Sequence, residues 1–278
     1  MIQDIGPKKY YNEYHDKAPD EKGRILVYRG SEVLISHKED GQIFFPALSD
    51  FSGCEMNYTY LFAINEEEFY LGEPVEWAIP EMYHFEHVRQ FRLARPRELA
   101  FAGITGHQLY EWYQRHIYCG ACGVRMHRDH KERMVKCPSC GNMVYPVISP
   151  AVIIAVTHNG KLLMSKYAGR EYKKYALIAG FNEIGETIEE TVHREVMEEV
   201  GLKVKNLKYY KSQPWPFTGT LLMGFFCELD GEDDRITLEE EELAEAGWYS
   251  PEEVPEDEER IALTREMMTR FKKGEYML

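Results

Sequence analysis

Three glutamates in one short stretch are spaced to act together. Glu195, Glu198 and Glu199 stand at positions i, i+3 and i+4, so a helix places all three carboxylates on one side. Like charges held so close repel one another unless a cation lies among them. Carboxylate oxygens are ligands that suit Mg²⁺ or Mn²⁺. The spacing therefore predicts a divalent-metal site on this helix, and the alternative is an acidic helix face that is merely solvated.

Four cysteines form a second group, arranged as two Cys-x-x-Cys pairs that are each followed by glycine. They are Cys119, Cys122, Cys137 and Cys140. Two such turns supply the four ligands of a closed tetrahedral site, which is typical of structural zinc. Iron is the alternative occupant, and two disulfides are disfavoured where thiols stay reduced. We expect Zn²⁺ here, with a role in folding rather than in catalysis.

The glutamates belong to a longer motif that runs from Gly180 to Leu202. The motif resembles the Nudix hydrolase box, G-x5-E-x7-R-E-U-x-E-E-x-G-U with U aliphatic, and matches it at every fixed position. The matching residues are Gly180, Glu186, Arg194, Glu195, Val196, Glu198, Glu199, Gly201 and Leu202. The resemblance implies a loop–helix–loop whose glutamates bind divalent ions. It also implies hydrolysis of a nucleoside diphosphate that is linked to another moiety.

The resemblance also assigns roles to single residues. It implies an ion pair between Glu186 and Arg194 that holds the loop to the helix. The stretch from Glu242 to Tyr249, Glu-Leu-Ala-Glu-Ala-Gly-Trp-Tyr, is similar to a family segment whose first glutamate is a further metal ligand. The implied ligands of Mg²⁺ or Mn²⁺ are Ala179, Glu195, Glu198, Glu199 and Glu242, and the four glutamates are the expected catalytic residues.

A downstream motif narrows the substrate. Ser212-Gln-Pro-Trp-Pro-Phe217 resembles the array of the NADH pyrophosphatase subfamily, whose members also carry a four-cysteine zinc ribbon before the Nudix domain. The prolines stiffen a loop that presents Trp215 and Phe217, and aromatic faces can stack on nicotinamide or adenine. The array departs from the family pattern at Thr218 and Thr220, where proline and serine are usual, which puts the substrate preference in question. Thr220 still offers a hydroxyl.

Residue matching to the same subfamily gives further expected substrate contacts. Phe181 resembles a base-stacking phenylalanine, and Tyr145 matches a tyrosine that reaches the neighbouring subunit's site. The expected substrate-binding residues are Glu132, Tyr145, Phe181, Gln213, Pro214, Trp215, Pro216, Phe217, Thr218, Gly219, Thr220 and Ala262.

Local patterns predict the elements that must position these residues. Apolar runs bounded by turn signals predict strands, the first four in an antiparallel sheet, at 24–28, 32–36, 43–45, 60–64, 151–156, 161–166, 207–213 and 221–229. The turn Asn159-Gly160 predicts a hairpin. Apolar residues at three- and four-residue spacing predict helices at 105–117, 187–200 and 256–273, the second of them ended by Gly201.

Together with the resemblance, these elements predict an α+β chain in three parts. We expect an N-terminal β-rich domain at 1–117, a four-cysteine zinc ribbon at 118–146 and a C-terminal Nudix α/β/α sandwich with a mixed sheet at 147–278.

The charge of the chain is concentrated in one segment. The 278 residues carry a formal net charge of −14, from 33 Lys and Arg against 47 Asp and Glu. Residues 230–259 hold 15 acids and one base, so this stretch accounts for the whole net charge. A localised charge of this kind does not argue against a phosphate-bearing substrate. Composition excludes a disordered or collagen-like chain, and without a signal peptide or a long apolar run we expect a cytoplasmic location and no membrane contact.

The expected function is metal-dependent hydrolysis of the pyrophosphate of NADH or NAD⁺ to nicotinamide mononucleotide and AMP, with removal of NAD caps from RNA as a related activity. We expect water activated by the metal to attack phosphorus and Glu198 or Glu242 to take its proton. One alternative is a Nudix hydrolase acting on ADP-ribose or diadenosine polyphosphates. An alternative of another class is a nucleic-acid binding module built on the zinc ribbon. The resemblance also implies a homodimer.

Overall fold

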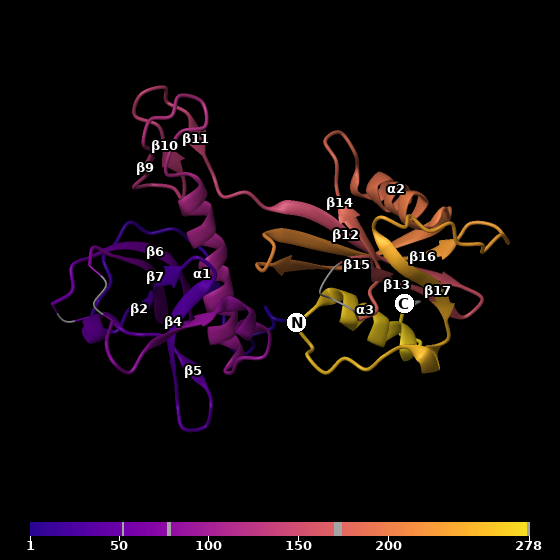
Figure 1. Cartoon of the computed structure of the whole chain (residues 1–278), viewed down its shortest axis with the longest axis horizontal. Helices are drawn as coiled ribbons and strands as arrows, with labels where there is room; N and C mark the ends of the chain where they lie inside the picture. Colours follow the sequence, from indigo (N-terminus) through magenta and orange to yellow (C-terminus); the bar gives the residue numbers. More distant parts are fainter. Residues whose placement is uncertain (52, 77–78, 170–173, 277–278) are drawn as a thin grey trace. The chain divides into compact units, whose positions relative to one another are not determined.

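The computed structural model describes residues 1–51, 53–76, 79–169 and 174–276 and divides the chain into two compact units (Figure 1). The C-terminal unit comprises Met1, Ile148–Trp215 and Gly219–Leu278. The N-terminal unit comprises Ile2–Val147 together with Pro216–Thr218. Helices and several sheets occur together, which confirms the predicted α+β class. The division into domains at 117/118 and 146/147 stays a prediction.

A mixed sheet forms the centre of the C-terminal unit. Its strand order is β15-β16-β12-β13-β17, and β14 pairs with β12. The strands are β12 (Ser149–His158), β13 (Lys161–Tyr167), β14 (Ile178–Phe181), β15 (Val204–Trp215), β16 (Thr220–Leu229) and β17 (Leu243–Tyr249). β12 and β16 run parallel, whereas the other pairs are antiparallel, so the sheet is mixed as predicted.

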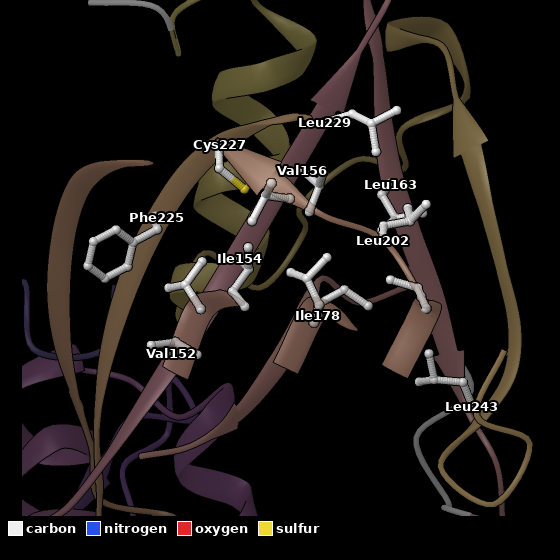
Figure 2. Close-up of a cluster of buried hydrophobic side chains, with 14 residues drawn as sticks. Val152, Ile154, Val156, Leu163, Ile178, Leu202, Phe225, Cys227, Leu229 and Leu243 are labelled. Carbon is white, nitrogen blue, oxygen red and sulfur yellow. The ribbon is translucent and has the colours of Figure 1, made fainter. Parts of the chain in front are cut away.

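Two helices pack on opposite faces of this sheet. Alternate residues of a strand point to opposite faces, and β12 divides its apolar side chains in that way. Val152, Ile154 and Val156 join a buried cluster with the valines of α2 (Ile188–Val200), part of which is drawn in Figure 2. Ile153 and Ala155 join a second cluster with α3 (Leu263–Lys272). This arrangement confirms the expected α/β/α sandwich.

Local sequence sets both ends of α2. The Thr187 side chain accepts a hydrogen bond from the amide of Glu190, and the Glu190 carboxylate accepts one from the amide of Thr187, which is a capping box. Gly201 ends the helix with a φ of 69°, a conformation that favours glycine. The observed helix therefore agrees with the predicted span to within one residue.

The last helix is shorter than predicted. α3 begins at Leu263, whereas the pattern predicted a start near residue 256. Arg260 has a φ of 54°, which no α-helical residue adopts, and the acidic run at 256–259 repels itself in a helical arrangement. A short 3₁₀ helix, η3 (Pro251–Glu253), precedes this stretch.

In its described residues, the N-terminal unit holds two small sheets, one long helix and the ribbon. One sheet has the order β1-β6-β7-β2, and the other has the order β3-β4-β5 with β8 beside β4. The strands are β1 (Tyr10–Tyr11), β2 (Arg24–Leu26), β3 (Tyr28–Arg29), β4 (Glu32–His37), β5 (Ile43–Phe44), β6 (Met56–Ile64), β7 (Glu67–Pro74) and β8 (His84–His87). The helices are η1 (Leu48–Phe51), η2 (Val88–Arg92) and α1 (Arg97–Arg115).

Two predictions for the N-terminal unit were wrong in detail. The four strands expected in one antiparallel sheet fall in two sheets, with β2 and β6 in one and β4 and β5 in the other, and β2 pairs in parallel with β7. The helix predicted at 105–117 begins eight residues earlier, at Arg97, because Leu99–Ile104 is almost continuously apolar and shows no polar alternation. Within the described residues, no helix is both long enough and apolar enough to cross a bilayer.

Candidate active site and zinc ribbon

Two of the three predicted metal-binding glutamates on α2 are buried. Glu195 is 8% exposed and Glu199 is 2% exposed, although both carry carboxylates. Glu198, on the same helix, is exposed to solvent. Burying a carboxylate is costly unless a cation or hydrogen-bond donors compensate for the lost water. The buried side of α2 therefore holds more negative charge than a packing role requires.

The Glu195 carboxylate packs against strand β14. A β-carbon built on Gly180 would stand 1.9 Å from Cδ of Glu195, so only glycine leaves room for the carboxylate. Gly180 pairs with Val152 of β12 and cannot move away without breaking the sheet. Its neighbour Ala179 has no polar side chain and can offer only its carbonyl oxygen to an ion.

Arg194 connects the loop to the helix. Its Nε donates to Oε1 of Glu186 at 2.6 Å and its Nη2 donates to Oε2 at 3.0 Å, which confirms the predicted ion pair. Nη2 also donates to the carbonyl of Phe181 at 2.9 Å. Nη1 donates to Glu195 at 2.7 Å and to Glu198 at 2.8 Å. The hydrogen bonds from Arg194 lower the pKa of Glu186 to about 2.

Two residues at variable positions of the motif support the same ion pair. The Thr191 hydroxyl lies 3.0 Å from Oε2 of Glu186, and the Asn182 amide donates to Thr191 at 2.7 Å and to the Glu186 carbonyl at 3.2 Å. Sequence analysis did not identify either residue. The one available signal was that Thr191 follows the N-cap Thr187 by four residues and so lies above it on the helix.

The charge of Glu242 acts on Glu195. Burial raises the pKa of Glu195, the nearby charges of Glu198 and Glu242 raise it further, and Arg194 opposes these effects. Glu242 itself is exposed in the turn before β17, where its carbonyl accepts a hydrogen bond from the amide of Ala168 at 2.8 Å. A glutamate more than 40 residues from the helix therefore acts on the buried carboxylate.

The donor set fits a hard divalent ion. Glu195, Glu198, Glu199 and Glu242 offer only oxygen, and the carbonyl of Ala179 adds another oxygen from β14. Among the described residues, no three of these carboxylates place their oxygens within 4.8 Å of one another. Arg194 supplies the positive charge that now holds Glu195 and Glu198.

The downstream array lies at the end of β15, and one of its residues clamps the chain before α3. Gln213 is fully buried. Its Nε2 donates to the carbonyl of Ile261 at 2.7 Å, and its Oε1 accepts from the amide of Leu263 at 2.6 Å. These bonds fix the backbone on both sides of Ala262, which caps α3. Two residues expected near the substrate are thus brought together, and the clamp itself was not foreseen.

The remaining array residues surround the turn between β15 and β16. Trp215 pairs with Thr220, which is 4% exposed, and Pro214 pairs with Leu221. Pro216, Phe217 and Thr218 form the part of the turn that belongs to the N-terminal unit, and Gly219 follows them with a φ of 70°. Phe181, at the end of β14, is 55% exposed. No substrate contact tests these assignments, so they stay predictions.

The four cysteines converge as predicted. The Sγ atom of Cys122 lies 3.4 Å from that of Cys137 and 3.5 Å from that of Cys140. The Sγ atoms of Cys119 and Cys140 lie 3.6 Å apart. Tetrahedral Zn²⁺ with four sulfurs at about 2.3 Å separates them by about 3.8 Å, so the arrangement needs almost no adjustment. A small sheet carries the two turns, with strands β9 (His127–Arg128), β10 (Val135–Lys136) and β11 (Met143–Val144).

Backbone amides favour the thiolate form of two of the four cysteines. Hydrogen bonds from the amides of Ala121 and Cys122 lower the pKa of Cys119 to about 6, and the amide of Cys140 lowers the pKa of Cys137. Gly123 and Gly141 follow the two pairs with φ of 74° and 75°. These features suit a structural zinc site with four cysteine ligands.

Glu132 and Tyr145 meet on the ribbon. The Tyr145 hydroxyl donates to Oε2 of Glu132 at 2.6 Å, and this hydrogen bond raises the pKa of the tyrosine. Tyr145 is 49% exposed. Two residues that matched separate positions of the family pattern therefore form one exposed pair.

Comparison with known proteins agrees with this geometry. Residues 148–271 match the NUDIX domain, and residues 114–145 match the NADH pyrophosphatase zinc ribbon domain. A protein of Escherichia fergusonii described as NAD-capped RNA hydrolase NudC is 40% identical over 186 residues, which cover 66% of this chain and 71% of that protein. A protein of Erwinia tasmaniensis with the same description is 41% identical over 150 residues, 54% of this chain and 57% of that protein.

Among solved structures, a NUDIX hydrolase from Nitrosomonas europaea aligns with a TM-score of 0.49 at 23% identity, over 56% of this chain and 90% of that one. The motif, the buried glutamates, the four-cysteine cluster and the extent of the identity to relatives lead to one assignment. The chain belongs to the Nudix hydrolase family and carries the zinc ribbon of its NADH pyrophosphatases.

Proposed function

We propose that this hydrolase cleaves the pyrophosphate of NAD(H), both in the free dinucleotide and at the 5′ end of NAD-capped RNA. The observation that carries the proposal is the pair of buried carboxylates, Glu195 and Glu199, on the helix of an intact box. The substrate class is taken from relatives described as NAD-capped RNA hydrolases and from the zinc ribbon. The expected products are nicotinamide mononucleotide and AMP, or nicotinamide mononucleotide and 5′-monophosphate RNA.

Mg²⁺ or Mn²⁺ would be held by Glu195, Glu198, Glu199, Glu242 and the Ala179 carbonyl. Once bound, such ions neutralise phosphate charge and lower the pKa of water. Glu198 and Glu242 are the two glutamates of this set that face solvent, so they are the candidates to accept the proton of the attacking water.

Arg194 and Glu186 give this site its rigidity. Arg194 holds the Phe181 carbonyl, the Glu186 carboxylate and the Glu195 carboxylate in one hydrogen-bonded set, so loop and helix keep a fixed spacing. A fixed spacing matters because misplacing a reacting group by about 1 Å can cost a factor of about 10² in rate. Phe181 directly follows Gly180, and its exposed ring can stack on a base.

A homodimer is part of the proposal. The ribbon and the connector after it expose large apolar side chains, which a second subunit would cover in a dimer. These side chains are Tyr118, Met143, Tyr145, Val147 and Ile148, each between 49% and 67% exposed. The Glu132–Tyr145 pair lies in this segment, in agreement with a role in the neighbouring subunit's site. A cytoplasmic location stays a prediction.

A substrate panel tests the proposal. Initial rates are measured with Mg²⁺ and with Mn²⁺ on NADH, NAD⁺, ADP-ribose, diadenosine tetraphosphate and NAD-capped RNA, with triphosphate RNA as the control. The proposal expects nicotinamide mononucleotide from NAD(H) and from the cap, and no cleavage of triphosphate RNA. Faster hydrolysis of ADP-ribose or diadenosine tetraphosphate than of every NAD-containing substrate would overturn the substrate assignment. RNA binding without hydrolysis would support the zinc ribbon as a nucleic-acid binding module instead.

A further inference from the structure

Two histidines and a glutamate meet in the N-terminal unit, outside the ribbon. His37 ends β4, and His84 and Glu86 lie on β8. Each imidazole places its Nε2 atom 2.7 Å from the same oxygen, Oε1 of Glu86. The two rings are nearly parallel, with an angle of 24° and centroids 5.8 Å apart. Three side chains with metal-binding atoms therefore converge on one point.

The backbone fixes this convergence. β4 and β8 form an antiparallel pair in which Ile35 lies opposite His84 and Val33 lies opposite Glu86. Residues two apart on a strand share a face, so His84 and Glu86 point to the same side. His37 follows Ile35 by two residues on that face and is held on its other edge by pairing with Ile43 of β5. The three ligands thus stand on hydrogen-bonded strands rather than on a loop.

The spacing of the ligand atoms suits a small ion. The two Nε2 atoms and the carboxylate oxygen all lie within 4.8 Å of one another. Tetrahedral zinc with bonds of about 2.0–2.1 Å sets its ligand atoms about 3.3 Å apart. Small side-chain rotations that move these atoms by a fraction of an ångström would lengthen the 2.7 Å Nε2–Oε1 distances to that value. The side chains of His37, His84 and Glu86 remain 36%, 55% and 29% exposed, which leaves water as the remaining ligand.

We propose that His37, His84 and Glu86 form a second metal site, which takes a divalent transition ion such as Zn²⁺ through two imidazole nitrogens and one carboxylate. Nitrogen donors favour borderline ions over Mg²⁺ and Ca²⁺. This site differs in that respect from the all-oxygen set of the Nudix box and from the all-sulfur set of the ribbon. Bound metal ties β4 to β8 and replaces the two hydrogen bonds that Glu86 now accepts.

Metal counting on the full chain tests the proposal. The carboxylates of the box also bind divalent ions, so the measurement uses a chain that carries Glu195→Gln and Glu199→Gln. The protein is dialysed to equilibrium against buffered micromolar free Zn²⁺, and zinc per chain is counted by mass spectrometry. The proposal expects two ions, one in the ribbon and one at the new site. Adding His37→Ala or His84→Ala should leave one ion.

His130→Ala is the matched control. His130 is an exposed histidine that contacts one carboxylate, Asp16, at 2.6 Å, so it resembles the proposed ligands except that it lacks a second nitrogen beside it. This variant should keep two ions. A count of one ion in the parent chain, or of two ions after His84→Ala, would overturn the proposal.

A second measurement does not depend on any substitution at the site. In nitrogen-resolved NMR of the imidazoles, zinc added to the chain with an already filled ribbon should shift Nε2 of His37 and His84 together and leave His130 unchanged. Equal shifts at all three histidines, or none, would contradict a specific site.

Discussion

A β-carbon on Gly180 would stand 1.9 Å from the carboxyl carbon of Glu195, although the two residues lie on different elements, β14 and α2. The glycine at the start of the box is therefore required for space, and its φ is not in the left-handed region. Gly180 allows the buried carboxylate to lie against the strand that also carries Ala179 and Phe181. Gly180, the first residue of the motif, is therefore in close steric contact with Glu195, 15 residues later in the same motif.

Gly180→Ala should therefore displace Glu195. The added methyl group cannot be accommodated by the strand, which pairs with β12, so the carboxylate must move by an ångström or more. We expect the rate constant for NADH hydrolysis to fall by about 10²-fold or more, with the fold retained by circular dichroism.

Gly120→Ala is the matched control for this change. A β-carbon there meets nothing within 4 Å, and its φ is not positive. This variant should keep its rate and its zinc. Equal rates for Gly180→Ala and the wild type would contradict the close contact.

Gln213→Leu should loosen the chain around Ala262. The substitution leaves the Ile261 carbonyl and the Leu263 amide buried without their side-chain partner. Each such group costs about 1–3 kcal/mol, so the free energy of unfolding should fall by a few kcal/mol in urea titrations. If Ala262 touches the substrate, KM should rise more than kcat falls. Gln114→Leu, at an exposed position of α1, should change neither quantity.

Cys137→Ser should remove the ribbon's metal. Cys137 is 1% exposed, and its sulfur lies 3.4 Å from that of Cys122. We expect zinc content by mass spectrometry to fall to zero at the ribbon and the melting temperature to drop, because four-cysteine sites contribute directly to folding. Cys54→Ser, outside the cluster, should keep the zinc. A visible iron–thiolate absorption in the purified wild type would instead favour iron.

The Glu186–Arg194 pair should make the free energy of unfolding depend on pH in the acid range. Hydrogen bonds from Arg194 lower the pKa of Glu186 to about 2 in the folded chain, from the ordinary value of 4.5. A lowered folded pKa contributes stability that is complete above about pH 4.5 and is lost as the pH falls towards 2. The difference in urea midpoint between the wild type and Glu186→Gln should be largest at pH 6–7 and shrink at pH 3. A difference that does not change with pH would contradict the ion pair.

The chemistry-bearing parts of the chain were predictable because they depend on short spacings. A helix places Glu195 and Glu199 together whatever surrounds it, and two Cys-x-x-Cys turns define a four-sulfur site locally. The end of the helix at Gly201 followed from capping for the same reason, and its start followed from the apolar periodicity.

Features that depend on tertiary contacts could not be predicted in this way. The clamp of Gln213 on the backbone around Ala262 joins positions nearly 50 residues apart, and neither carries a local signal for it. The parallel pairing of β2 with β7 and the left-handed Arg260 are likewise set by packing rather than by residue pattern. The steric need for Gly180 appeared only once α2 was placed against β14.

Hydrolysis of NADH by Glu199→Gln is the most direct test of the central claim that this hydrolase cleaves the pyrophosphate of NAD(H) with the buried glutamates of α2 as metal ligands. The control is Glu189→Gln, which makes the same change at an exposed position of the same helix. With Mg²⁺ or Mn²⁺, the wild type and Glu189→Gln should release reduced nicotinamide mononucleotide and AMP at equal rates. Glu199→Gln should be slower by at least about 10²-fold. Mutating a residue that only hydrogen-bonds to a metal ligand already lowers activity by about 10- to 100-fold, and losing the ligand itself should lower it more. A Glu199→Gln enzyme as fast as the wild type, or a wild type that releases neither product, would contradict the account.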